Sequence, residues 1–184
     1  MEIKTFINIK DYDKDGKLFN EEEHECHSFV IAFIDLLNVQ FTQASESIKD
    51  TGNTSRTISA YAANFAVDAA AADATKGIVV GTGTNAVAMT DYALQTLIAH
   101  GNGANQLSYG AMTFDPTSTT SGSDRYFQIY RTFTNNSGGN ITITEVGLYA
   151  VMYVYKGMLE RTLLTHTINN GASATFTYKI KITV

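Results

Sequence analysis

Alternation of inward and outward side chains in the last third of the chain is the feature that most constrains the fold. Phe127, Ile129, Arg131 and Phe133 alternate there with Tyr126, Gln128, Tyr130 and Thr132. A period of two is typical of a β-strand, because successive side chains of a strand point to opposite faces. Further strands are expected over 141–155, 159–168 and 174–184, with turns at 135–139, Lys156-Gly157 and 169–171. Regular strands separated by Gly and Asn turns predict an antiparallel meander that closes into a sandwich or barrel.

The beginning of the chain also alternates, and a helix is expected after it. Isoleucines at every second position predict a strand over residues 2–10, and Asp15-Gly16 offers a hairpin turn. Ser28 is suited to cap a helix that continues to about residue 40. The segment is apolar around most of its girth, which is typical of a helix buried on more than one side.

The middle of the chain is less regular. Residues 45–59 predict a strand, a turn at 51–54 and a second strand, and 77–81 predicts a short buried strand between glycines. The alanine-rich stretch from Ala60 to Ala74 is compatible with a helical turn or two, a flat strand or a loop. Residues 99–107 and 115–124 are expected to be loops.

Together these patterns predict a mainly β protein, an antiparallel sandwich or barrel-like domain with one buried helix near residues 28–40. We expect an N-terminal hairpin-helix-hairpin arm or subdomain over 1–59 and a β-sandwich domain over 60–184. The alternative is that the 184 residues form one continuous domain.

Composition favours assembly over nucleic-acid or membrane binding. Charged residues make up only 17% of the chain, and surfaces of hydroxyls and amides bury against a neighbour with little desolvation of full charges. The net charge of -5 and the lack of basic clusters argue against nucleic acid. The most apolar stretch, 29–37, is too short to cross a bilayer, and residues 1–4 do not resemble a signal peptide. Cys26 is the only cysteine, so no intrachain disulfide is expected.

The sharpest motif is an EF-hand-like loop. It places Asp11, Asp13, Asp15, Gly16 and Glu22 at the diagnostic positions, and carboxylate oxygens are the ligands that Ca²⁺ prefers. An EF-hand also needs a helix before the loop, whereas residues 2–10 alternate like a strand. The favoured interpretation is a charged hairpin tip, and calcium binding is kept as an alternative.

A second candidate metal site is the cluster of His24, Cys26 and His27. Imidazole and thiolate suit Zn²⁺, but three ligands within four residues do not easily surround one tetrahedral ion. His100 and His166 lie far along the chain and supply no second ligand pair. We therefore expect no metal site and no cofactor.

Catalytic motifs are weak. The glycine-rich segments 81–84 and 101–103 lack the lysine of a phosphate-binding loop and are interpreted as turns. Asp91, Asp124 and Glu145 are candidates for a hydrolytic carboxylate pair, but nothing in the sequence brings them together. We expect no catalytic residues and no enzymatic activity.

Aromatic residues are the remaining candidates for a functional surface. They are core residues of the sheets or, for some of them, an interface or sugar-stacking surface, because tyrosine combines a large apolar area with a polar tip. The candidates are Tyr126, Phe127, Tyr130, Phe133, Tyr149, Tyr153 and Tyr155.

Two blocks of the sequence resemble small virion proteins of tailed bacteriophages. The first covers Ser28-Phe29-Val30, Phe33, Leu36-Leu37, Lys49-Asp50-Thr51-Gly52 and Thr54-Ser55-Arg56; the second covers 77–84, 91–94, 106–109, 144–149 and 178–184. The resemblance implies a capsid decoration protein, a head-fibre or fibre base, or a tail component located in the virion. It does not separate head from tail, and it carries over no catalytic residues.

The sequence thus predicts a virion structural protein that forms a homo-oligomer and contacts other virion proteins, such as the major capsid or tail proteins. Many weak strand and apolar contacts, repeated by symmetry, would stabilise the particle. Two alternatives remain: a carbohydrate- or receptor-binding sandwich module of a fibre, and a calcium-binding protein that uses the loop 11–22.

Overall fold

The computed structural model describes residues 2–26, 29–42, 44–61 and 65–183, and it confirms a mainly β, antiparallel fold with one short helix. The elements in chain order are β1 (Glu2–Tyr12), β2 (Leu18–Cys26), α1 (Ile31–Thr42), β3 (Glu46–Lys49), β4 (Ser55–Ile58), β5 (Gly77–Gly81), β6 (Ser108–Phe114), β7 (Thr119–Ser121), β8 (Asp124–Thr134), β9 (Ile141–Met152), β10 (Tyr155–Ile168) and β11 (Ser173–Thr183).

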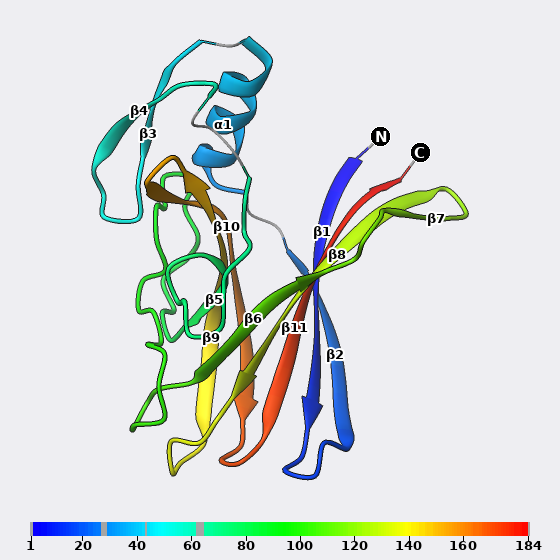
Figure 1. Ribbon diagram of the computed structural model, residues 1–184. Helices are drawn as coiled ribbons and strands as arrows, with labels where there is room; N and C mark the ends of the chain where they lie inside the picture. Colours follow the sequence, from blue (N-terminus) through cyan, green and yellow to red (C-terminus); the bar gives the residue numbers. More distant parts are fainter. Residues whose placement is uncertain (1, 27–28, 43, 62–64, 184) are drawn as a thin grey trace.

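Two antiparallel sheets face each other and enclose the core. The larger sheet has the strand order β2-β1-β11-β8-β6, with β7 paired to β8, and the smaller one has the order β10-β9-β5. Side chains such as Phe133 and Phe176 from the larger sheet and Val80 and Met158 from the smaller one are completely buried. A separate hairpin, β3-β4, lies beside α1 at one end of the molecule (Figure 1).

Strands from distant parts of the sequence form the centre of the larger sheet. β1 pairs with β11 in an unbroken register from Glu2↔Thr183 to Tyr12↔Ser173, and β11 pairs with β8 along its other edge. The larger sheet therefore contains strands from both expected units, 1–59 and 60–184.

Three hairpin turns lie at the same end of the sandwich (Figure 1). The turn expected at Asp15-Gly16 is confirmed, and Gly16 has the positive φ of 79° that a tight turn favours. The turns at 135–140 and 169–172 are also confirmed, and Gly171 has a φ of 80°.

The turn expected at Lys156-Gly157 is wrong. The chain reverses three residues earlier, at Tyr153-Val154, and Gly157 lies within β10 opposite Ala150. A Cβ atom on Gly157 would lie 2.6 Å from Sδ of Met152. The glycine is accounted for by close packing within the sheet, whereas the sequence interpretation assigned it to a turn.

The helix α1 is confirmed in place, although it begins at Ile31 and its expected cap, Ser28, lies outside the described residues. Ala32, Leu36 and Val39 are buried against the body of the protein. Ile31 and Ile34 are 46% and 59% exposed, so burial covers less of the apolar girth than the sequence indicated. At 12 residues α1 is too short to cross a bilayer, and no other described segment forms a helix suited to do so.

The alanine-rich segment is irregular where it is described, and a buried arginine holds it in place. Arg131 of β8 is 1% exposed and donates hydrogen bonds to five backbone carbonyls, those of Ala70, Asp73, Lys76, Ile78 and Gly110. Its guanidinium also lies 4.8 Å from the ring centre of Tyr109. Backbone groups that lack a neighbouring strand still need hydrogen-bond partners. The Arg131 side chain supplies donors for these carbonyl groups.

The long segment between β5 and β6 is also held by side chains. Glu145 of β9 is completely buried and accepts hydrogen bonds from the backbone N–H groups of Gly83, Gln95 and Thr96. It also accepts one from Nε of Arg161, at 2.8 Å. Arg161 in turn donates to Asp91 and to the carbonyl of Asn85. This buried network fixes residues 82–96 on the smaller sheet.

We predict that Arg131→Leu lowers the free energy of unfolding by more than about 3 kcal/mol. The change leaves several buried carbonyl groups without donors, and each loses a hydrogen bond to a charged group. Urea unfolding followed by fluorescence or circular dichroism would measure the change.

Arg125→Leu is the matched control. Arg125 lies on the same strand and the same face, but it is exposed and bonds only Ser118 and Thr120 in the hydrogen bonds described. Its loss should change the stability by less than about 1 kcal/mol. Equal effects of the two substitutions would contradict the structural role given to Arg131.

Candidate functional site

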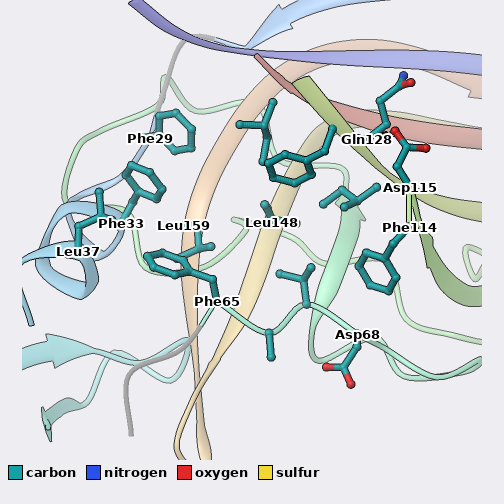
Figure 2. A pocket seen from close by; sticks show the side chains of 15 residues that line it. Phe29, Phe33, Leu37, Phe65, Asp68, Phe114, Asp115, Gln128, Leu148 and Leu159 are labelled. Atoms are coloured by element: carbon teal, nitrogen blue, oxygen red, sulfur yellow. Dashed lines mark hydrogen bonds between the residues drawn. The ribbon is translucent and has the colours of Figure 1, made fainter. Parts of the chain in front are cut away.

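A large apolar pocket opens at the end of the sandwich opposite the three hairpin turns. We call it the open-end pocket. It has a volume of about 550 Å³, and five phenylalanines contribute to its walls: Phe29, Phe33, Phe65, Phe114 and Phe127. Aliphatic side chains complete the lining, from Leu37, Val67, Ile129, Leu148, Leu159 and Ile180. Figure 2 shows the labelled rings of Phe29, Phe33 and Phe65 on one side of the space and that of Phe114 on the other.

The pocket exists because the larger sheet continues beyond the part that the smaller sheet covers. On the inner face of β8, exposure rises along the strand from 0% for Phe133 and 4% for Ile129 to 40% for Phe127. Ile180, the neighbour of Phe127 across the β8-β11 ladder, also lines the pocket. The upper ends of β1, β8 and β11 bend away from β9 and β10 (Figure 1). The apolar inner face of the larger sheet therefore extends beyond the smaller sheet that covers the rest of it.

Aromatic contacts form the opposite wall. The rings of Phe29 and Phe33 stack with their centres 4.1 Å apart, and Phe33 meets Phe65 at 5.8 Å. Phe29 is held beside β10 by a backbone bridge to Glu160, and α1 presents Phe33 and Leu37 to the pocket. The wall is thus fixed by neighbouring elements of the fold.

Two acidic residues, Asp68 and Asp115, line the pocket, and no basic residue is among its lining residues. The carboxylate of Asp115 accepts hydrogen bonds from Oη of Tyr130 at 2.6 Å and from the backbone of Gln128 at 3.0 Å. Burial, together with this bond, raises the pKa of Tyr130 to about 12. Both donors to Asp115 are neutral, so the pocket combines a broad apolar surface with a negative charge near its edge.

The EF-hand-like loop does not have EF-hand geometry. Residues 2–12 form a strand where an EF-hand has a helix, and the motif spans a β-hairpin. Oδ1 of Asp13 accepts the backbone N–H groups of Asp15 and Lys17, each at 2.9 Å. The bond from Lys17 lowers the pKa of Asp13. The sequence match reflects a turn in which the Asp13 side chain accepts hydrogen bonds from the backbone of the turn itself.

Asp11 and Glu22 of the same motif contact a histidine between the sheets. His166 of β10 is 5% exposed, and its Nε2 lies 2.8 Å from Oδ1 of Asp11. Its Nδ1 contacts Glu22, and Asp11 also accepts a bond from Asn20. These contacts connect the β1-β2 hairpin of the larger sheet to β10 of the smaller one. Asp11 and Glu22, two of the carboxylates in the calcium-binding alternative, therefore join the two sheets.

The histidine and cysteine cluster is also not assembled as a zinc site. His27 lies outside the described residues, His24 is 3.6 Å from Glu22, and the thiol of Cys26 is buried. Burial raises the pKa of Cys26 well above its usual range, and Glu160 nearby adds to the effect. His100 accepts a backbone N–H from Tyr109. Within the described part of the chain, no three His, Cys, Asp or Glu residues are grouped to hold a metal ion.

The structure brings together two of the three candidate carboxylates. Asp91 and Glu145 both bind Arg161, whereas Asp124 pairs with Lys181 elsewhere. The oxygens of Glu145 already accept four hydrogen bonds, which leaves this carboxylate no position for a reacting proton. Residues 82–84, interpreted as a turn, are irregular in the structure, and the backbone N–H of Gly83 donates to Glu145.

The candidate aromatic residues are divided between core and surface. Phe133 and Tyr149 are buried, and Oη of Tyr149 accepts the backbone N–H of Leu94. Tyr126 lies under Lys179, and Tyr155 lies under Arg56 with 4.0 Å between the guanidinium carbon and the ring centre. Only Phe127 of the seven lines the open-end pocket, and Tyr153 is 63% exposed at a turn.

No protein-family model, curated protein or solved structure matches this chain.

Sequence reasoning missed most of the open-end pocket. Phe65 lies in the ambiguous alanine-rich stretch, and Phe114 lies next to a segment interpreted as a loop. An isolated large aromatic residue beside small or polar neighbours was the available signal for both. The buried role of Arg131 had a clearer signal, because the alternation places it on the same face as Ile129 and Phe133.

A buried acid next to the pocket wall gives a prediction on pH. Glu160 is 1% exposed and accepts hydrogen bonds from Thr162 and Tyr178. Burial raises its pKa from 4.5 to about 7, and the two hydroxyl groups offset only part of that effect. The folded protein therefore retains a proton that the unfolded chain loses near pH 4.5.

We predict that stability falls as the pH rises from about 4.5 to about 7, and that Glu160→Gln removes this fall. Below pH 4.5 both states hold the proton; between the two values only the folded state binds it, so rising pH favours unfolding. The contribution is on the order of 3 kcal/mol. Urea unfolding at several pH values would measure it, with the exposed Glu23→Gln as control. An unchanged pH slope in Glu160→Gln would contradict the assignment.

Proposed function

We propose that this protein is a non-enzymatic structural component of a tailed-phage particle, where it assembles with copies of itself and with other virion proteins. The assignment to a phage rests on the resemblance of the two sequence blocks described above. The assignment to assembly rests on the open-end pocket, a sandwich end whose apolar inner face is left uncovered.

The pocket supports assembly because an uncovered apolar face is unfavourable in water. Removal of such a surface from water is favourable by roughly 25 cal/mol per Å², before the entropic cost of association. Contiguous exposed apolar patches on soluble proteins mark sites of protein or ligand contact. The walls of this pocket come from α1, β6, β8, β9, β10 and β11 and from connecting segments, so one partner would contact many elements at once.

The low charge of the chain supports the same proposal. With charged residues at 17%, few side chains need to lose their hydration when two copies meet. The two buried arginines, Arg131 and Arg161, lie elsewhere in the fold and do not line the pocket.

We predict that the purified protein forms a defined oligomer, with a mass that is a multiple of the 20.0 kDa chain mass. Size-exclusion chromatography with light scattering, over a hundredfold range of concentration, would measure the mass. A protein that remains monomeric throughout that range would contradict self-assembly.

The phage assignment needs a separate observation. We expect the coding sequence to lie among phage head or tail genes, next to a major capsid gene for a head protein or a tape-measure or baseplate gene for a tail protein. A position within a cellular operon of metabolic genes would contradict it.

A further inference from the structure

The two-residue turn between β9 and β10 is unusual in sequence and conformation. We call Tyr153 and Val154 the Tyr-Val tip. Two-residue hairpin turns favour Gly, Asn or Asp, because at least one of their residues has a positive φ. Tyr153 nevertheless has a φ of 61°, a conformation that is strained for a large side chain.

The tip is also apolar and exposed. Tyr153 and Val154 are 63% and 64% exposed, which is more than either Phe114 or Phe127 in the open-end pocket. A strained backbone and two exposed apolar side chains both oppose the stability of an isolated chain. Neither feature contributes to the described contacts of the fold, and both fit a turn that is buried in a complex.

The tip cannot fill the pocket of its own chain. The pocket is lined by Leu148 of β9, and the tip lies five residues further along the same paired strands, roughly 16 Å away. The β9-β10 ladder remains paired up to Met152↔Tyr155, so the hairpin holds its tip away from the pocket. A tip that enters such a pocket must come from another copy.

The tip and the pocket are complementary in chemistry. The pocket is apolar, Asp68 at its edge already pairs with Lys76 at 3.2 Å, and Asp115 is held by neutral donors; the tip combines two apolar side chains with Lys156 nearby. Tyrosine suits this environment, because its ring fits an apolar wall and its hydroxyl can donate to a carboxylate. Opposite charges at the edges favour the correct pairing of the two surfaces.

We propose that the Tyr-Val tip of one copy occupies the open-end pocket of a second copy. This inference rests on the proposed function, since it names the contact through which the copies assemble. Each contact buries Phe114 and Phe127 of one chain together with Tyr153 and Val154 of the other.

We predict that Tyr153→Gly and Phe127→Ser each raise the dissociation constant for self-association at least tenfold. Tyr153→Gly should leave the melting temperature of the separated chain unchanged or higher, because glycine removes the strain of the positive φ. Analytical ultracentrifugation and thermal unfolding would measure the two quantities. If the turn had a purely structural role, Tyr153→Gly would raise the melting temperature without weakening self-association, which would contradict the proposal.

Phe19→Ser is the matched control. Phe19 is 54% exposed and is the second residue of β2. The β1-β2 turn that precedes it lies at the opposite end of the sandwich from the pocket (Figure 1), so loss of the Phe19 side chain should change the dissociation constant less than about twofold. Cysteine variants give a positive test. Mixing Val154→Cys with Phe114→Cys should produce a disulfide-linked dimer under oxidation, whereas Val154→Cys mixed with Phe19→Cys should not.

The outcomes separate the two proposals. If Tyr153→Gly and Phe127→Ser both self-associate as tightly as the wild-type protein, the tip-in-pocket contact is overturned. The proposed function then remains in place. Loss of association in only one of the two variants also overturns the contact, because the tip or the pocket then meets a different surface. A wild-type monomer at every concentration overturns both proposals.

Discussion

The buried pairing of Arg161 with Glu145 is the interaction on which the arrangement of the smaller sheet depends. The strands β5, β9 and β10 form only two backbone ladders, and the long segment after β5 must find its hydrogen-bond partners elsewhere. Glu145 supplies acceptors for three backbone N–H groups, and Arg161 neutralises it while binding Asp91. A buried ion pair adds little net stability over an apolar pair of similar shape. Its effect here is to specify one conformation for a segment that has no ladder of its own.

Arg131 likewise uses a buried side chain to bind backbone groups in another part of the core. Its guanidinium binds carbonyl oxygens only, so the positive charge is spread over five partial charges and the ring of Tyr109. His166, between Asp11 and Glu22, joins the edges of the two sheets in a comparable way. The sandwich therefore contains buried polar groups as well as an apolar core. The open-end pocket lies at the end near α1.

The sequence predicted the elements whose signals are local. Alternation located β8, β9 and β11 within a few residues, and Asp15-Gly16 located the first hairpin turn because glycine meets a backbone requirement there. The turn between β9 and β10 was misplaced because Gly157 satisfies a packing requirement with Met152, which sequence spacing does not reveal. The EF-hand-like spacing of Asp11, Asp13 and Asp15 is likewise a local pattern, and its use in joining sheets depends on His166, more than 140 residues away. The pocket is assembled from α1, five strands and the segments that connect them, so no single stretch of sequence could indicate it.

The pairing of β1 with β11 has a consequence for how the chain reaches its folded state. These two strands lie at the centre of the larger sheet, yet about 160 residues separate them along the chain. At 5–20 residues per second, a ribosome needs roughly 10 to 30 seconds to add β11 after β1 has emerged. During that interval the β1-β2 hairpin has an unpaired inner edge, and an isolated hairpin is only marginally stable in water. The glutamates of β2 protect its outer edge from neighbouring nascent chains, whereas β1 stays open to mispairing until β11 has been synthesised.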